Sequence, residues 1–372
     1  MSSGLSNRLL LCGSFGFGNA GDEAVPLAVG DLLEGMGRGN VEIDLLTRFD
    51  RPQLGSAIGL GDEYSAKREK MKGANVAVVG GGIVEPNNFC ILARCHRFLS
   101  SDFACASGLF AVNVESAVRY SWLRCRRIRR WVHDCRVLTV RDVVSQEAFR
   151  RILGDCKASV EVVGDCVLGL EPSAHVPANI AGLRPFMTVT LAPRWNETCG
   201  WLDWISGEVA LGLNVVFVPM SVVHDDDRPG HRVVSERVRG ALSGGLEVYC
   251  IEEIAGPREL MAVFGMSELT LSMRLHGCVM AYAAETPFIA LGYHPKIWGF
   301  AQSVGWEGAT IPGVPPQMSL RGNGYGFSFS ELGVSSGDVV RVAKSVVGRD
   351  DFSMRERYLA RQRDVLRELT GW

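Results

Sequence analysis

Residues 9–24, LLLCGSFGFGNAGDEA, decide how the chain begins to fold. The apolar run Leu9–Cys12 predicts a buried strand, the glycines after it spell G-x-G-x-x-G, and the residues beyond Gly21 predict a helix. Strand, glycine turn and helix in this order are typical of a dinucleotide-binding unit, in which an acid ~20 residues further on binds a ribose. Asp44 stands at about that distance. An NAD-dependent enzyme is therefore the first hypothesis to test.

The charges around the turn argue against NAD. Asp22 and Glu23 follow the last glycine directly, in the helical turn whose free backbone N–H groups would have to bind the pyrophosphate. Carboxylates there satisfy the helix end themselves and repel a phosphate. Asp44 lies inside its apolar run, with Leu45 and Leu46 after it, whereas a ribose-binding acid closes its strand. The glycine turn must therefore serve another purpose.

The bulk composition is that of a globular protein of about two domains. The chain has 372 residues, 47% of them apolar and 22% charged, and its 39 basic and 41 acidic side chains nearly balance. A nucleic-acid-binding domain would be basic, so we expect no nucleic-acid partner. No apolar run reaches the ~18 residues of a membrane span, and we expect no signal peptide. The 11 cysteines are scattered without a C-x-x-C pair, which predicts reduced thiols in a cytoplasmic protein and no zinc site.

Short apolar runs alternate with longer amphipathic stretches along the chain. This alternation predicts an α/β fold with parallel sheets that helices cover on both faces. The expected strands are Leu9–Cys12, Val41–Leu46, Val76–Val79, Leu109–Val114, Val137–Val140 and Val160–Val163 in the first half, and Met187–Leu191, Asn214–Val218, Glu247–Ile251, Glu268–Leu271 and Phe288–Leu291 in the second.

The pattern breaks at residues 169–185, which hold three prolines and little periodicity, and we interpret this stretch as an interdomain linker. We expect two doubly wound, Rossmann-like domains facing a cleft: an N-terminal, acceptor-side domain over 1–178 and a C-terminal, donor-side domain over 183–345. Residues 346–372 contain a charged amphipathic helix, Met354–Leu369, that can pack back on the N-terminal domain.

Positive charge gathers where the strands of the second half end. Ligands of open α/β sheets bind outside the carboxyl ends of the strands, often at helix N-termini. Arg274 and His276 stand between a strand and a helix in SELTLSMRLHGCVMAYAAETP, and Arg194 and Lys296 follow two other strands in the same way. Arg141, in TVRD, can reach across from the first domain. These groups suit a small, multiply charged anion.

Each of these residues also has a structural interpretation. An arginine after a strand is commonly paired with a carboxylate, and Arg141 stands beside Asp142. His276, next to an apolar helix, could be a core histidine satisfied by backbone groups. The combination of Arg274 and His276 with Arg194 placed alike favours the functional interpretation.

Five segments resemble the polysaccharide pyruvyl transferase family. GSFGFGNAGDEAV (13–25) is similar to its opening glycine loop, and LSMRLHGCVMAYAAETPFIALGYHPKIWGF (271–300) is similar to its most specific signature, S-x-R-x-H followed by a small-residue helix and Y-x-x-K. GGGIV (80–84), TVRDVVSQE (139–147) and VVGDCVLGL (162–170) fit between them in order. The resemblance departs from the family at Cys166, where a proline is usual, and at two loops, Glu85 and Asn113-Val114-Glu115, which we expect to face the acceptor.

The resemblance implies a two-domain fold like that of GT-B glycosyltransferases. It also implies transfer of pyruvate from phosphoenolpyruvate onto a saccharide as a ketal, in cell-surface or exopolysaccharide biosynthesis. Phosphoenolpyruvate is then the donor substrate, and we expect no cofactor and no metal, because the cations already neutralise the departing phosphate. The acceptor is a saccharide or a lipid-linked saccharide.

Resemblance and position together assign roles to individual residues. We expect His276 to be the general acid, because an imidazole donates a proton near neutral pH, and Asp22 or Glu23 to accept the hydroxyl proton. The residues expected to bind phosphoenolpyruvate are Arg194, Arg274, Leu275, His276, Lys296 and Arg141. The residues expected at the acceptor are Ser14, Phe15, Gly18, Asn19 and Asp22, of which Phe15 either stacks on a sugar or closes the turn, and Asn19 either orients the acceptor or is a turn residue.

Two charge runs lie outside this assignment. Asp225-Asp226-Asp227 looks like a metal cluster, but three consecutive carboxylates cannot all point one way, so we interpret the run as a solvated loop. Within residues 119–130, the segment 124–130 holds five arginines, which form a solvated face or else touch an anionic membrane or a lipid-pyrophosphate acceptor. The second interpretation would place the protein at the inner face of the membrane.

Two rival functions remain open. A glycosyltransferase or sugar epimerase of the same fold, using a nucleotide-diphosphate sugar, would share the Arg-Leu-His site. It should also have an acidic ribose clamp after a late strand, and residues 285–296, ETPFIALGYHPK, contain none. The other rival is a non-catalytic protein that binds an anionic sugar.

Overall fold

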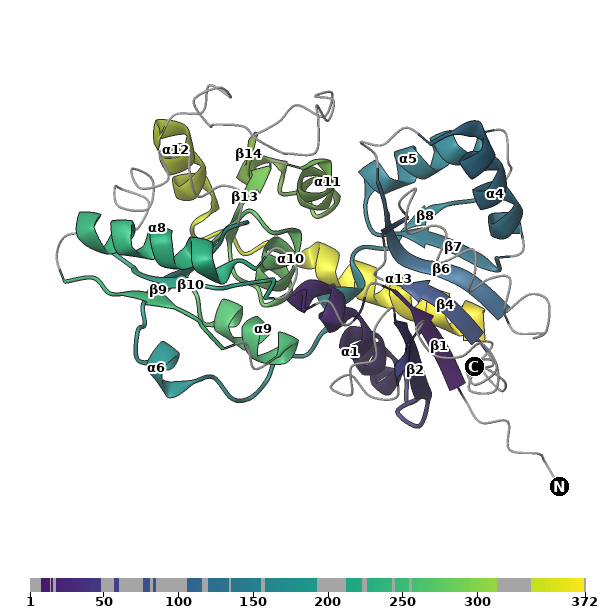
Figure 1. Cartoon of the computed structure of the whole chain (residues 1–372), viewed down its shortest axis with the longest axis horizontal. Coiled ribbons are helices and arrows are strands. Elements are labelled where there is room, and N and C mark those ends of the chain that lie inside the picture. Colours follow the sequence, from purple (N-terminus) through teal and green to yellow (C-terminus); the bar gives the residue numbers. More distant parts are fainter. Residues whose placement is uncertain are drawn as a thin grey trace. The chain divides into compact units, whose positions relative to one another are not determined.

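The structure is a computed structural model with two compact units. It describes residues 8–13, 15, 18–47, 57–59, 76–80, 83–84, 106–115, 120–133, 135–154, 158–192, 212–222, 226–242, 245–253, 256–292, 294–312 and 336–370. The N-terminal unit comprises Met1–Phe17, Asp22–Leu170 and Glu356–Trp372, and the C-terminal unit comprises Gly18–Gly21 and Glu171–Arg355. Each unit contains a parallel sheet with helices on both faces (Figure 1). No helix in the described part of the chain is long and apolar enough to cross a bilayer.

The sheet of the N-terminal unit has the strand order β3-β2-β1-β4-β6-β7-β8, and β5 pairs with β6. Every pair is parallel. Its strands are β1 (Arg8–Cys12), β2 (Glu42–Thr47), β3 (Ala57–Gly59), β4 (Val76–Gly80), β5 (Ile83–Val84), β6 (Ala106–Val114), β7 (Val137–Val140) and β8 (Glu161–Val162), and its helices are α1 (Ala20–Gly35), α4 (Trp122–His133), α5 (Val143–Leu153), the 3₁₀ turn η2 (Cys166–Gly169) and α13 (Ser353–Thr370).

Apolar residues on both faces of this sheet explain why it is doubly wound. Strand β1 is apolar from Leu9 to Cys12 and buried throughout, as expected of a strand with helices on either side. On one face, Ile128 and Trp131 of α4 pack with Phe149 of α5 in one apolar cluster. On the other face, Gly108 leaves room for Leu369 of α13. The expected parallel sheet is thereby confirmed for this unit.

Helix α13, the last element of the chain, is fastened to the end of β8. The amide of Gln362 donates to the carbonyl oxygens of Val163 (2.9 Å) and Asp165 (3.1 Å), and Arg361 binds Glu161 with two hydrogen bonds of 2.5 and 2.6 Å. Because Gln362 is fully buried, these two bonds fix the position of the helix along the sheet.

The C-terminal unit has a six-stranded sheet in the order β11-β10-β9-β12-β13-β14, again parallel at every pair. Its strands are β9 (Phe186–Thr190), β10 (Asn214–Phe217), β11 (Val248–Cys250), β12 (Leu269–Ser272), β13 (Phe288–Gly292) and β14 (Thr310–Pro312), and its helices are α6 (Ala178–Ala181), α8 (Arg228–Ala241), α9 (Pro257–Gly265), α10 (Leu275–Ala283), α11 (Pro295–Ser303), the 3₁₀ turn η5 (Glu307–Ala309) and α12 (Ser336–Val346). In order of appearance this is a 3-2-1-4-5-6 sheet, the doubly wound order, whose direction of winding reverses between β9 and β12.

The two strands at this reversal, β9 and β12, are held together by hydroxyl groups. The hydroxyl of Thr188 bonds to that of Thr270 at 2.7 Å, and Thr190 bonds to Ser272 at 2.6 Å. Helix α10 then crosses so closely that a Cβ on Gly277 would lie 2.3 Å from Ser272 Oγ and 2.9 Å from Thr190 Oγ1. Only glycine therefore fits where α10 leaves the sheet edge.

We predict that Gly277→Ala destabilises the protein by roughly 1–3 kcal/mol, because the added methyl group has to displace paired hydroxyls in a packed interior. Gly240→Ala, in α8, is the matched control. A Cβ there meets nothing within 4 Å, so alanine should stabilise the helix by up to ~1 kcal/mol. Urea denaturation of both variants measures the difference, and equal effects would contradict the close packing of α10.

Candidate active site

The strand-to-helix connection β12–α10 presents two of the predicted functional residues, Arg274 and His276. Arg274 occupies the N-cap position of α10, with extended backbone, and no side chain caps the helix there. Its carbonyl oxygen accepts a hydrogen bond of 2.6 Å from Ser272 Oγ, which ties the turn to the end of β12. His276 follows in the first helical turn and is half-buried. The connection stands at the reversal of the sheet, where ligands of doubly wound domains bind.

The guanidinium of Arg274 forms an ion pair with Asp227, at the start of α8. Asp227 is 0% exposed, and its second carboxylate oxygen accepts hydrogen bonds from the backbone N–H groups of Met220 (2.9 Å) and Ser221 (3.0 Å). Burial raises the pKa of this carboxyl to about 6, against the opposing effect of the Arg274 charge. Arg274 is thus held by a carboxylate that is itself fixed by the backbone.

This pair corrects the expectation for the run Asp225-Asp226-Asp227. Asp227 is no part of a solvated loop, because it is fully buried and accepts hydrogen bonds from the backbone N–H groups of Met220 and Ser221. Asp226 does face the surface, where it pairs with Arg228 at 2.8 Å, and Asp225 lies outside the described residues. Among the residues that the structure describes, no group of three metal-binding side chains occurs.

His231, one turn further along α8, is a buried neighbour of this site that the sequence analysis missed. Its Nε2 accepts a hydrogen bond of 3.0 Å from the N–H of Leu191, the first residue after β9, and its Nδ1 has no partner. Burial lowers the pKa of the imidazole to about 4. A neutral His231 therefore anchors the end of β9, the strand that precedes Arg194 in the sequence. Arg194 itself lies outside the described residues.

The short segment Gly18–Gly21 belongs to the C-terminal unit, where it pairs with the residues after β10. The N–H of Ala20 donates to Met220 O at 2.8 Å, and the N–H of Val222 donates to Gly18 O at 3.0 Å, which forms a short antiparallel bridge. Asn19 Oδ1 accepts a hydrogen bond of 3.1 Å from the N–H of Gly21. Asn19 is therefore a turn residue, one of its two predicted roles.

Gly21 lies against the imidazole of His276. A Cβ on this glycine would lie 1.9 Å from His276 Nδ1, so no other residue fits without moving the ring. Packing thus explains the last glycine of the opening pattern. Residue 21 has no side chain because the imidazole of His276 occupies the space that a Cβ would need. Asp22 and Glu23, the two predicted bases, follow Gly21 directly in the first turn of α1, and both are half-buried.

Three further predicted residues have a mainly structural environment. Phe15 is 0% exposed, which favours a structural role of its ring over stacking on a sugar. Leu275 is buried in the first turn of α10. Asp44 is buried and pairs with Arg8 on the neighbouring strand, which is a structural role for the acid that the NAD hypothesis would have needed. Ser14 lies outside the described residues.

Arg141 is bound inside the N-terminal unit. Its guanidinium donates to Asn113 Oδ1 (2.7 Å) and Asp142 Oδ2 (3.1 Å) and lies 3.6 Å from Asp165 Oδ2, and all four side chains are buried. Of the two interpretations of Arg141, the carboxylate pair is the one that the structure contains, and we assign this arginine a structural role. The same cluster buries Asn113, which the sequence analysis placed in an acceptor-facing loop.

Lys296 stands in the first turn of α11, after β13. Its backbone N–H donates to Nδ1 of His294, the buried N-cap residue of that helix, at 3.3 Å. The side chain of Lys296 is half-buried. Lys296 and Arg274 thus begin two successive helices, α11 and α10, at the same edge of the C-terminal sheet.

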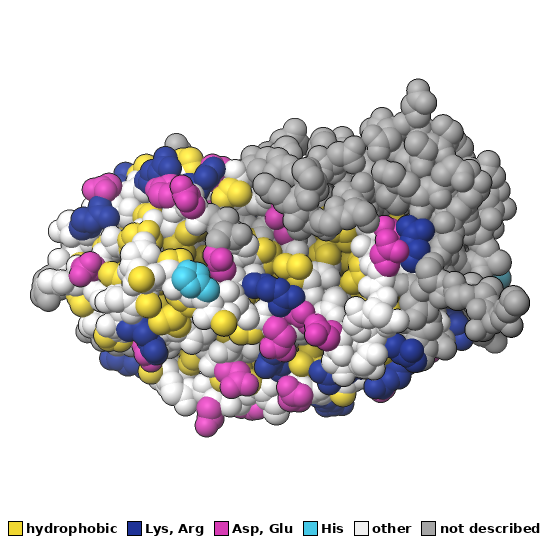
Figure 2. Space-filling model, turned by 90° about the horizontal axis from the view of Figure 1, so that it is seen from below, with side chains coloured by type: hydrophobic (Ala, Val, Ile, Leu, Met, Phe, Trp, Pro, Cys, Tyr) yellow, Lys and Arg dark blue, Asp and Glu magenta, His cyan; other side chains and the backbone are white. Residues whose placement is uncertain are grey.

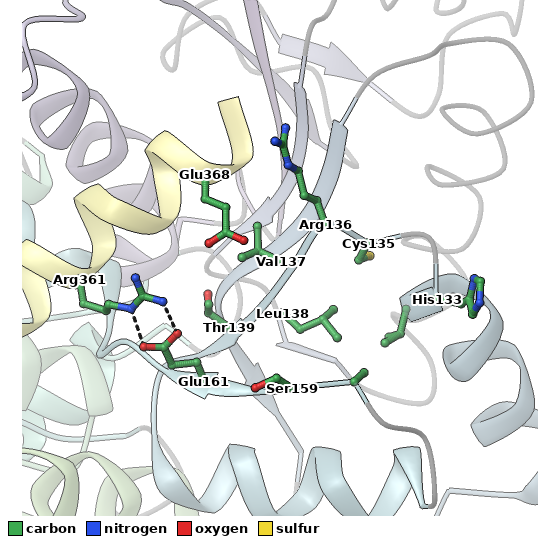
Figure 3. A pocket seen from close by; sticks show the side chains of 12 residues that line it. His133, Cys135, Arg136, Val137, Leu138, Thr139, Ser159, Glu161, Arg361 and Glu368 are labelled. Atoms are coloured by element: carbon green, nitrogen blue, oxygen red, sulfur yellow. Dashed lines mark hydrogen bonds and ion pairs between the residues drawn. The ribbon is translucent and has the colours of Figure 1, made fainter. Parts of the chain in front are cut away.

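Two pockets lie at the opposite edges of the sheets and are not this site. One, of about 580 Å³, opens at the amino ends of β7 and β8, where Val137 and Glu161 begin the strands and Arg361 of α13 pairs with Glu161 (Figure 3). The other, of about 670 Å³, is lined by Pro185 and Pro287, which precede β9 and β13. The second pocket is therefore at the end of its sheet opposite to the end that bears the Arg274 turn.

We predict that Asp227→Asn lowers the free energy of unfolding by about 1–3 kcal/mol, because Arg274 loses its charged partner in a largely buried position. Asp226→Asn is the matched control one residue away. Its pair with Arg228 is more exposed, so its loss should cost at most ~1 kcal/mol. Urea denaturation at pH 7.5, above the raised pKa of Asp227, measures both variants. An equal loss in the two would contradict the burial of Asp227.

His231 should make the stability of the protein depend on pH. With a pKa of about 4 in the folded state and an ordinary value of 6.5 when unfolded, the imidazole takes up its proton preferentially in the unfolded chain between these values. The contribution of His231 to the free energy of unfolding should therefore fall as the pH drops from 6.5 to 4, opposite in sign to the contribution of the buried Asp227 carboxyl. The free energy of unfolding at pH 4, relative to that at pH 6.5, should consequently be higher in His231→Gln than in the wild type. Urea midpoints measured across this range test the difference, and parallel curves for the two proteins would refute it.

Comparison with known proteins identifies the fold and the family. The sequence model of the family described as polysaccharide pyruvyl transferase matches residues 19–295. Comparison with curated proteins gives no significant match. UDP-GlcNAc 2-epimerase from Methanocaldococcus jannaschii is similar in structure with a TM-score of 0.60 at 13% identity, over 98% of this chain and 100% of that chain. UDP-GlcNAc 2-epimerase from Neisseria meningitidis, bound to UDP-GlcNAc, has a TM-score of 0.55 at 10% identity, over 97% of this chain and 98% of that chain.

At these identities the structural likeness shows the fold alone, and it confirms the expected GT-B-like fold. The family match shows more, because it runs from Asn19 in the glycine turn to Pro295, the residue before Lys296, and so includes the whole Arg274 turn. The chain belongs to the polysaccharide pyruvyl transferase family.

Proposed function

We propose that this protein transfers pyruvate from phosphoenolpyruvate to two hydroxyl groups of a saccharide, forming a cyclic ketal and releasing phosphate, in cell-surface or exopolysaccharide biosynthesis. Family membership implies a pyruvyl transferase and a polysaccharide acceptor. The observation that supports phosphoenolpyruvate as the donor is the turn between β12 and α10. It places a carboxylate-anchored guanidinium, an imidazole and a helix N-terminus without a side-chain cap at the reversal point of a doubly wound sheet.

Phosphoenolpyruvate carries a carboxylate and a phosphate on the same carbon skeleton, so its site needs several cations in fixed positions. Arg274 suits one of these anionic groups, because its guanidinium is planar, permanently charged and already oriented by Asp227. Lys296, at the start of α11, is proposed to neutralise the other group as a point charge. Arg194 remains a proposed ligand by its place in the sequence, three residues after Leu191.

The proposed reaction begins with a proton delivered to the methylene carbon of phosphoenolpyruvate, which becomes a methyl group and leaves the neighbouring carbon electrophilic. One sugar hydroxyl adds to that carbon and loses its proton to a base. The bond between the carbon and the phosphate oxygen breaks, phosphate departs, and a second hydroxyl closes the ketal with loss of its proton. No oxidation or reduction occurs, so the reaction needs no redox cofactor.

His276 is proposed to be the acid, because it is the titratable side chain next to Arg274 and stands half-buried at the helix terminus. Its ring is held from one side by the backbone at Gly21, which limits its orientation. Asp22 or Glu23 is proposed as the base for the acceptor hydroxyls, since both directly follow Gly21 in the chain. An acid and a base of this kind contribute ~10²–10⁴-fold each to the rate.

Phosphate release tests the proposal against its two rivals. The purified protein is incubated with phosphoenolpyruvate and a panel of saccharides and lipid-linked saccharides, and free phosphate is measured together with the mass of the acceptor. Release that depends on the acceptor, with a mass increase for a pyruvate ketal, supports the transferase. Turnover of a nucleotide-diphosphate sugar would instead support a glycosyltransferase or epimerase, and sugar binding without turnover would support a binding protein.

We predict that His276→Ala lowers kcat by roughly 10²–10⁴-fold while the Kd for phosphoenolpyruvate changes little, because the acid acts on the transition state. Arg274→Gln should raise that Kd by at least roughly tenfold, because a charge-assisted hydrogen bond is lost. His175→Ala, an exposed histidine after η2, is the control and should behave like the wild type. Calorimetry of donor binding and the phosphate assay measure the two effects separately. A His276→Ala protein with normal turnover would rule out this acid.

A further inference from the structure

Helix α4 exposes a basic surface that the proposed reaction does not use. Its inner side packs on the sheet through Ile128, Trp131 and Val132, all of them buried. The remaining turns carry arginines, and within the helix no acidic residue accompanies them. We call the exposed residues of this helix, apart from Arg129 and His133, the α4 surface; they are Trp122, Leu123, Arg124, Arg126, Arg127 and Arg130.

The arginines of the α4 surface have no carboxylate partner in the described part of the chain. The fifth arginine of the helix, Arg129, differs, because its Nε donates to the carbonyl oxygen of Ile152 at 2.8 Å and so fastens α4 to α5. On the neighbouring helix α5, Glu147 is already paired with Arg151 at 3.7 Å. The charge of the α4 surface is therefore not neutralised by the helices that pack with it.

Helix α8 shows what an ordinary arginine-rich surface helix looks like in the same protein. Arg228 pairs with Asp226, Arg232 with Glu252 and Arg239 with Glu236, the last on the same helix. Figure 2 likewise shows a face on which acidic and basic side chains are interspersed. Against this pattern the α4 surface stands out by its single sign of charge.

Two large apolar side chains stand at the start of this basic helix. Trp122 is 67% exposed and Leu123 is 62% exposed, more than any other large apolar side chain in the described residues, of which the next is Val347 at 47%. The guanidinium of Arg126 lies over the Trp122 ring, 5.5 Å from its centroid. An exposed tryptophan and leucine have a favourable place at the boundary between lipid headgroups and acyl chains, where arginine meets lipid phosphate.

We propose that the α4 surface binds an anionic lipid bilayer, with Trp122 and Leu123 inserted at the headgroup boundary and Arg124, Arg126, Arg127 and Arg130 on the lipid phosphates. Charge complementarity to an anionic leaflet and the two adjoining apolar side chains together select this partner. A nucleic acid would use the arginines but gains nothing from an exposed leucine on the same helix. The inference does not rest on the proposed reaction, because binding to vesicles needs neither donor nor acceptor.

Sedimentation of the full chain with vesicles tests the proposal. The vesicles contain phosphatidylcholine and phosphatidylglycerol in equal amounts, and vesicles of phosphatidylcholine alone serve as the neutral reference. The wild type should bind the anionic vesicles and not the neutral ones. Arg126→Gln/Arg130→Gln should weaken binding by roughly 20-fold, since each arginine near an anionic surface contributes about fivefold. Trp122→Ser/Leu123→Ser should weaken it by roughly tenfold or more, because apolar area is no longer buried.

Arg237→Gln/Arg357→Gln is the matched control, because it removes the same charge from two exposed arginines elsewhere and should leave vesicle binding nearly unchanged. Urea midpoints equal to that of the wild type establish that each variant is folded. Three results would overturn the proposal: no binding of the wild type to anionic vesicles, an equal loss in the control, or full binding by Trp122→Ser/Leu123→Ser. Binding to transfer RNA in place of vesicles would assign the surface to nucleic acid and would also overturn it.

Discussion

The buried carboxylate of Asp227 is the interaction on which the candidate active site depends. It accepts from Met220 and Ser221 with one oxygen and from Arg274 with the other, so it joins the turn after β10 to the turn after β12. Met220 O also accepts the N–H of Ala20, which brings the glycine segment to the same turn. A carboxylate in such a place is costly to bury unless all its partners are present. The carboxylate of Asp227 consequently fixes the turn after β10, the start of α8 and the guanidinium of Arg274 relative to one another.

The glycine segment shows how a familiar pattern can have an unfamiliar physical cause. In a dinucleotide-binding turn, glycines make room for a pyrophosphate at a helix N-terminus. Here the bare backbone at Gly21 makes room for the imidazole of His276, and Asn19 caps the turn through the N–H of Gly21. The acids that follow, Asp22 and Glu23, lie in the first turn of α1. A backbone position that another group approaches within the radius of a side chain requires glycine, whether that group is a phosphate or an imidazole.

Sequence reasoning located the strands and the Arg274 turn because both depend on local pattern. Apolar runs placed every strand of four or more residues to within a few residues, and they also placed the short β8 and β11, whereas β3, β5 and β14, of two or three residues each, were not expected. It missed Asp227 and His231, because their burial is decided by the turn 220–222 and by the end of β9, both remote in sequence. Phe15 is fully buried, and its neighbours in the sequence do not predict this burial either.

The arginines of this chain illustrate why position decides what a positive charge can do. Arg141 is enclosed by Asp142, Asp165 and Asn113, so its positive charge stabilises the interior of the N-terminal unit. Arg274 is paired with the buried carboxylate of Asp227 and remains partly exposed, and this pairing orients its guanidinium. The arginines of the α4 surface have no partner among the described carboxylates, and their side chains are exposed. Such groups attract a broad anionic surface through their summed charge.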